Sequence, residues 1–126
     1  MDNDKIADVL DEAADLYESE RYDWCQGQAI TADGFSICAS LALAMACGMT
    51  ITKGLPRVYP PYHVWGNDMK LFSEPLYRAA EGALAPALGP GRGIVGFNDA
   101  KNSGRTKQDI IDLFKNTAKE LRNGDQ

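Results

Sequence analysis

The sequence predicts a single, mainly helical domain spanning residues 1–126, with about four helices around a buried central helix (residues 36–47) and a short strand or small hairpin, an α+β variant. Two segments near the chain ends have amphipathic helical periodicity, and one between them is apolar on every side. Hydrophobic content is 44% and charged content 25%, ordinary globular values. A chain of this length buries about two-thirds of its unfolded surface, enough for a core without disulfides.

The first expected helix covers residues 3–17. One face is apolar at the i, i+3, i+4, i+7 spacing, and the other is nearly all acidic. Asn3 or Asp4 is the expected N-cap. Helical periodicity is lost after residue 18, which predicts a structured loop with a short extended piece at Gln28–Thr31.

Residues 36–47, SICASLALAMAC, are apolar all round and are followed by Gly48, a residue suited to a left-handed C-cap. This segment is the predicted central helix. Residues 49–72 carry three prolines and no helical periodicity, so a long connection with at most one edge strand is expected.

The third helix is expected to begin at Ser73, with Pro75 in its first turn, and to end at Pro86. Residues 94–97 form a short apolar run, which predicts a strand. The last helix has the clearest signals, because Thr106 and Asp109 form a capping-box pattern ahead of an amphipathic stretch that reaches residue 122.

The net charge of −5 is unevenly distributed. Residues 1–33 hold ten acidic and two basic side chains, whereas residues 34–126 hold eight acidic and eleven basic ones. The acidic helix could meet a basic partner and the remainder an anion, although a solvated face explains a charge run more simply. Nucleic-acid binding is not expected, because no basic stripe with interleaved aromatic residues is present.

A cytoplasmic location without membrane association is expected. The longest apolar run, residues 41–49, is far shorter than the roughly 20 residues that span a bilayer. The N-terminus is acidic, unlike a signal peptide. Cys25, Cys38 and Cys47 are odd in number and lack an export signal, so free thiols are expected.

No metal or cofactor is expected. Residues 91–96, GRGIVG, match G-x-G-x-x-G, but the predicted order of helix, proline and strand lacks the strand and helix that a dinucleotide site needs. The three cysteines lack a C-x-x-C pair, and His63 is the only histidine, so a zinc site lacks its usual local chelate.

A papain-like cysteine hydrolase is the sharpest enzymatic hypothesis. Cys38 would lie in the first turn of the apolar helix, where the dipole lowers a thiol pKa, and His63 and Asn98 or Asp99 follow in the papain-like order. The competing interpretation is a Cys38 that packs in the core and a structural His63 in a proline- and tyrosine-rich loop.

An anion site is the second hypothesis. The loop 98–106 brings polar side chains to the N-terminus of the last helix, where free N–H groups favour a phosphate or nucleotide. Alternatively, Asn98 and Asp99 cap a turn, and Thr106 caps the helix. Trp24 is either an exposed side chain that recognises a ligand or partner, or a buried residue of the core.

Several of these segments together resemble a family of small uncharacterised proteins from bacteria and their phages. The shared pattern is a first helix, W-x-Q-G, a Cys-Ala pair opening an alanine-rich helix, W-N-D, and an R-T-x-x-[DE]-[VI] helix start. It falls on Trp24, Gln26, Gly27, Cys38, Ala39, Asn98, Asp99, Arg105 and Thr106. Phe97 replaces the family's tryptophan, Ser40 interrupts its small-residue run, and residues 48–93 are largely uncovered. The resemblance implies a phage or prophage setting, and the family has no known activity to transfer to this chain.

We therefore expect a small accessory protein that binds a host protein or a small anionic, nucleotide-like ligand and does not act by catalysis. The expected site combines two loops and contains Trp24, Gln26, Asn98, Asp99 and Arg105. One alternative is the hydrolase with Cys38, His63 and Asn98. The other is a structural protein that assembles as a homo-oligomer.

Overall fold

The computed structural model describes residues 2–27, 30–31, 35–48, 52–53, 62–63, 74–89, 93–100 and 104–124. Within these ranges the chain is mainly helical, as predicted. The elements are α1 (Asn3–Glu18), β1 (Asp23–Trp24), β2 (Ser36–Ile37), α2 (Ala39–Ala46), β3 (Thr52–Lys53), β4 (Tyr62–His63), α4 (Pro75–Leu88), α5 (Ile94–Asp99) and α6 (Lys107–Asn123).

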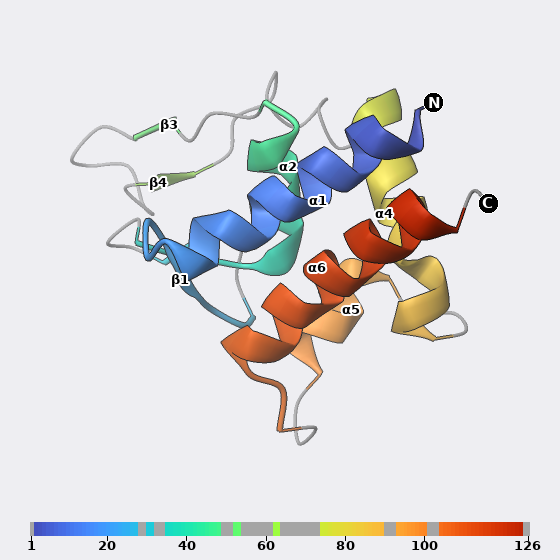
Figure 1. Cartoon of the computed structure of the whole chain (residues 1–126). Coiled ribbons are helices and arrows are strands. Elements are labelled where there is room, and N and C mark those ends of the chain that lie inside the picture. The colour runs from blue at the N-terminus through green and yellow to red at the C-terminus, as the bar shows by residue number, and fades with distance from the viewer. Residues whose placement is uncertain are drawn as a thin grey trace.

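Helices α1 and α6 lie side by side and antiparallel, so the two ends of the chain are neighbours (Figure 1). Asp2, not Asn3 or Asp4, caps α1, because its carboxylate accepts a hydrogen bond from the Asp4 N–H at 2.9 Å. The predicted capping box of α6 is confirmed, since Thr106 and Asp109 each accept the other's backbone N–H.

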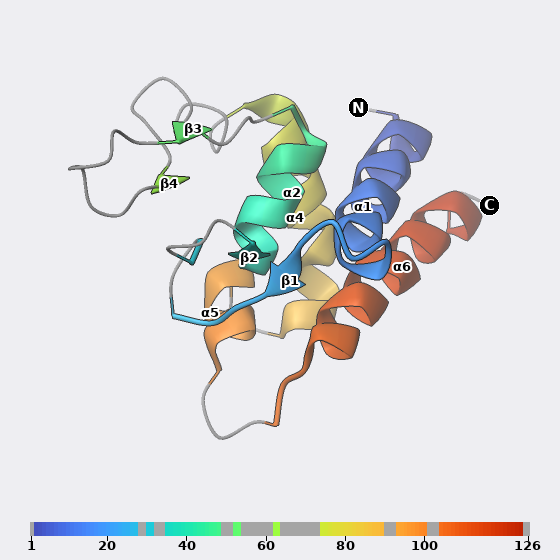
Figure 2. The same cartoon turned by 90° about the vertical axis from the view of Figure 1, so that its left-hand side faces the viewer.

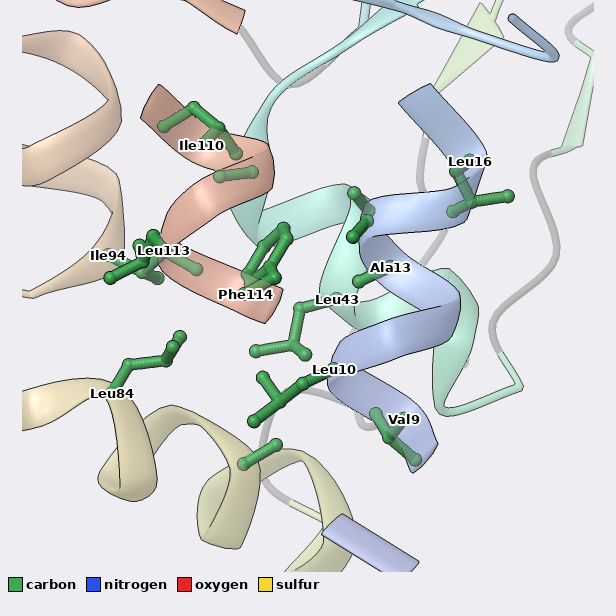
Figure 3. Close-up of a cluster of buried hydrophobic side chains, with 14 of the residues drawn as sticks. Val9, Leu10, Ala13, Leu16, Leu43, Leu84, Ile94, Ile110, Leu113 and Phe114 are labelled. Atoms are coloured by element: carbon green, nitrogen blue, oxygen red, sulfur yellow. The ribbon is translucent and has the colours of Figure 1, made fainter. Parts of the chain in front are cut away.

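The core lies between α1, α2, α4 and α6. Figure 3 shows apolar side chains from all four helices, and from α5, converging on one cluster. Leu10, Leu43, Leu84 and Phe114 are completely buried there. Helix α2 is buried throughout residues 39–44, which confirms a central apolar helix, although a shorter one than residues 36–47.

The predicted start of the central helix at Ser36 is wrong. Ser36 and Ile37 form β2, which pairs in parallel with β1 in the register Asp23↔Ser36 and Trp24↔Ile37. Ile37 also bridges Ile30 in the antiparallel sense, and its carbonyl accepts the Tyr17 hydroxyl at 2.9 Å. These contacts with distant segments hold residues 36–37 extended despite their apolar sequence. The predicted extended piece at 28–31 is described only at Ile30 and Thr31.

The predicted strand at residues 94–97 is also wrong, because these residues form helix α5. The Phe97 N–H donates to the Gly93 carbonyl at 3.0 Å, and Ile94 and Asn98, four residues apart, are both buried. A short apolar run has too few residues for its periodicity to separate a helix from a strand. In the described residues, the element that precedes the G-x-G-x-x-G match is helix α4, where a dinucleotide site has a strand.

Helix α4 has Pro75 in its first turn, as expected, but it begins at Pro75 with Glu74 as its N-cap, two residues after the predicted start, and it continues past Pro86 to Leu88. Leu84 and Leu88, on either side of this proline, are buried, and their burial offsets the hydrogen bond that proline removes near the helix end. Ser73 lies outside the described residues. The described part of the connection at residues 49–72 holds two strands where one at most was expected: β3 and β4 form an antiparallel pair, with Thr52 opposite His63. No described helix has the length and apolarity needed to cross a membrane.

Candidate functional site

Asn98 is the centre of a buried polar cluster that joins three distant segments. Its side chain is completely buried. Its Oδ1 accepts hydrogen bonds from the Trp24 indole N–H at 2.6 Å and from the Ala39 N–H at 2.9 Å. Its Nδ2 donates to the Cys25 carbonyl at 3.0 Å and to Asp99 Oδ1 at 2.8 Å. An amide has two donors and two acceptor sites, so the Asn98 side chain is fully used.

The position of this amide follows from the strand register. The Cys25 N–H donates to the Ile37 carbonyl at 3.3 Å, as the parallel register requires. If the ladder continued, its next hydrogen bond would run from the Ala39 N–H to the Cys25 carbonyl. The Asn98 amide lies between these two groups and bonds to both. It therefore extends the ladder and supplies the cap that the Cys38 side chain does not give α2.

Asp99 and Gln26 strengthen the same junction. Asp99 Oδ1 accepts the Gly27 N–H at 2.9 Å, and the Gln26 side-chain amide donates to the Asn98 carbonyl at 2.8 Å. Gly27 has a φ of 80°, which glycine adopts without strain. Of the two loops expected to be adjacent, Trp24–Gly27 and Asn98–Thr106, the second contacts the first through Asn98 and Asp99, the last residues of α5. Figure 2 shows α5 beneath β1 and the start of α2.

Arg105 lies next to this cluster and contacts Phe97. Its Nε donates to the Phe97 carbonyl at 3.2 Å, and its Cζ lies 3.5 Å from the centroid of the Phe97 ring. This stacked arginine holds the residues just before α6 against α5. Of the loop proposed to bind an anion, residues 101–103 lie outside the described part of the chain.

Cys38 is buried, with 8% of its surface exposed, and burial raises the pKa of its thiol. The protonated thiol is the poorer nucleophile. Asn98 has no bond left for a histidine, and His63 belongs to β4, with its side chain outside what the structure describes. Among the described residues, no group of three His, Cys, Asp or Glu side chains could share a metal ion.

The sequence matches a family of unknown function, DUF6197, over residues 1–120. The chain belongs to this family. No curated protein and no solved structure matches it. In this DUF6197 member, Trp24, Gln26, Ala39, Asn98 and Asp99 meet in one cluster, through hydrogen bonds that join α5, α2, β1 and the loop after it.

The acidic face of α1 is largely neutralised within this DUF6197 chain. Arg122 of α6 forms ion pairs with Asp8 at 2.7 Å and with Asp11, and Lys115 pairs with Glu18 at 3.0 Å. Arg21 pairs with Asp15 at 2.9 Å. These exposed pairs add little stability each, but they leave less of the acidic stripe for a basic partner.

An open hollow of about 260 Å³ lies beside β1, on the side of α6, and the sequence did not predict it. It is lined by Glu20, Tyr22, Asp23, Phe35 and Lys107. Phe35 is 48% exposed, one of two large apolar side chains in the described residues to be so exposed. Glu20 has a φ of 61° and is the only described non-glycine residue with positive φ. We call this feature the Phe35 hollow.

Proposed function

We propose that this DUF6197 protein is a binding domain that captures a partner protein at the Phe35 hollow and does not act by catalysis. The observation that carries the proposal is the exposure of Phe35 in a hollow bordered by charged side chains. Sites that recognise proteins combine such an aromatic anchor with a polar rim.

The polar cluster supports this proposal because the hydrogen bonds of its central side chain are all made within the protein. Asn98, one of the five site residues expected from the sequence, uses every side-chain hydrogen bond within its own chain. The cluster fixes the loop after β1 and the start of α2, two segments that border β1 and β2. In this proposal the motif residues build the surface, and other residues contact the partner.

A small anionic ligand is the weaker candidate. At the polar cluster, Asp99 presents a carboxylate, and the Phe35 hollow holds Glu20 and Asp23 against one Lys107. These charges would repel a phosphate or nucleotide. The resemblance to proteins of bacteria and their phages supports a bacterial setting, so the proposed partner is a cytoplasmic protein of the bacterial host.

Site-directed photo-crosslinking tests the proposal. A photoreactive phenylalanine analogue is introduced at Phe35 and, as a matched control, at Lys119, an exposed position of α6. After irradiation in bacterial cells, we expect a discrete adduct from position 35 and not from position 119. The crosslinked protein is then identified by mass spectrometry and purified.

Binding of that purified partner decides the outcome. Phe35→Ala should weaken it at least about tenfold, as expected for an anchor residue, with an unchanged melting temperature. Adducts of equal yield from both positions, or unchanged affinity of Phe35→Ala, would refute the proposal.

A further inference from the structure

We propose that the Phe35 hollow receives an arginine side chain of the partner protein. The inference rests on the proposed binding function and names the group that is recognised. It follows from three features of the hollow: an uncompensated carboxylate, two aromatic residues and a strained backbone.

The Glu20 carboxylate supplies the uncompensated charge. Among the described residues that line the hollow, Lys107 is the only base, and its Nζ lies 3.5 Å from Asp23 Oδ1, so its charge is already matched. None of the described residues forms an ion pair or a side-chain hydrogen bond with Glu20, which is exposed. A cation from outside would therefore complete the charge balance of the hollow.

Tyr22 and Phe35 make arginine the best match for this cation. A guanidinium is planar and weakly hydrated, and it stacks on aromatic rings more readily than an ammonium does. The same chain already contains this pairing, because the Arg105 guanidinium lies over the Phe97 ring. An arginine in the hollow could contact an aromatic residue and the Glu20 carboxylate at once.

The backbone of Glu20 points to the same site. Glu20 follows Ser19, the C-cap of α1, and lies in the left-handed region, where glycine is strongly favoured. Its N–H still bonds to the Tyr17 carbonyl at 3.1 Å, so the turn itself does not need a side chain. Strained residues of this kind concentrate at binding sites, and here the strain holds a carboxylate at the hollow.

The test uses capped tripeptides and the isotope-labelled full-length chain. Glycyl-arginyl-glycine is compared with the same peptide carrying citrulline, a neutral isostere of arginine, and binding is followed by backbone amide shifts. We expect saturable shifts at Tyr22, Asp23 and Lys107 with a Kd on the order of millimolar for the arginine peptide, because one exposed ion pair and one cation–π contact are weak. The citrulline peptide should bind at least about fivefold more weakly.

A pair of variants completes the design. Glu20→Gln should weaken arginine-peptide binding about threefold to tenfold and leave citrulline binding unchanged. Glu12→Gln, which removes an exposed acid elsewhere on α1, should change neither. The inference would be overturned if both peptides bind equally, if the shifts centre outside the hollow, or if Glu20→Gln binds the arginine peptide as tightly as the wild type does.

The two proposals fail separately. If the Phe35 crosslink and its alanine control succeed but the peptides do not discriminate, the hollow binds a protein by another group and only the arginine is wrong. If the crosslink fails, the binding function is refuted, whatever the peptides show.

Discussion

The Asn98 side chain accepts the backbone N–H of Ala39 at 2.9 Å across 59 positions of sequence. This bond places a cap from α5 on the first turn of α2. The sequence left open whether Asn98 caps the chain or holds a ligand. With all four side-chain bonds internal, Asn98 is a structural cap.

Replacement of Asn98 by alanine should therefore destabilise the fold strongly. Asn98→Ala removes four hydrogen bonds at once, among them the bond to the buried Ala39 N–H, and each buried polar group left unsatisfied costs about 1–3 kcal/mol. We expect the free energy of unfolding to fall by about 3–5 kcal/mol in urea titrations. Gln108→Ala, which removes one surface amide bond to Asp112, is the control and should change it by less than about 0.5 kcal/mol.

A loss below about 1 kcal/mol in Asn98→Ala would contradict the capping role and return Asn98 to the list of ligand-binding candidates. A large loss would make Asn98→Ala unsuitable as a test of binding. Any effect of Asn98→Ala on a partner would follow from unfolding.

Replacement of Glu20 by glycine should stabilise the protein. The left-handed conformation strains a residue with a Cβ, so Glu20→Gly is expected to raise the free energy of unfolding by about 1 kcal/mol. Glu12→Gly, in the exposed interior of the same helix, should instead lower it by about 1 kcal/mol. Thermal and urea unfolding measure both. A Glu20→Gly variant less stable than the wild type would mean that Glu20 makes a favourable contact that outweighs its strain.

Helices α1 and α6 were predictable because their sequence signals are local. The stripes of α1 and α6 and the Thr106–Asp109 capping box involve residues within a few positions of each other, so single-sequence periodicity detects them. Helix α5 has six residues, too few for a period, and was predicted as a strand. Ser36 and Ile37 continue an apolar run, and only pairing with β1 shows that they are extended.

The sequence predicted which residues meet in the polar cluster better than it predicted what they do there. Trp24, Gln26, Asn98 and Asp99 were grouped from the polar composition of two loops, and hydrogen bonds do connect them. Their partners are distant in sequence, so nothing local could reveal that the bonds close on the chain itself. The Phe35 hollow combines the end of α1, the segment before β2 and the start of α6, and no motif marks such a surface.

Native Cys38 should resist alkylation. Burial raises its thiol pKa and limits access, so iodoacetamide at pH 7 should modify it much more slowly in the native protein than in urea. Cys47, whose pKa is raised by burial to about 11, should also react slowly. Peptide mass mapping over time distinguishes the thiols. Equal rates for Cys38 with and without urea would restore the cysteine hydrolase as a hypothesis.

Alkaline pH should destabilise the fold through Tyr77. Its hydroxyl hydrogen-bonds with Ser40 at 2.9 Å, and burial raises its pKa to about 12, against about 10 in an unfolded chain. Because the folded pKa is the higher one, this contribution is complete below pH 10 and is lost as the pH rises towards 12. We expect ionisation of Tyr77 to lower the free energy of unfolding by about 1 kcal/mol between pH 9 and 11.

Urea titrations of wild type and Tyr77→Phe across this range measure the effect as a difference in pH slope, in which the other titrating groups cancel. The variant should begin less stable at pH 9, because Ser40 loses its partner, and then decline less steeply. Parallel slopes would show that Tyr77 titrates alike in both states and that its burial does not govern its ionisation.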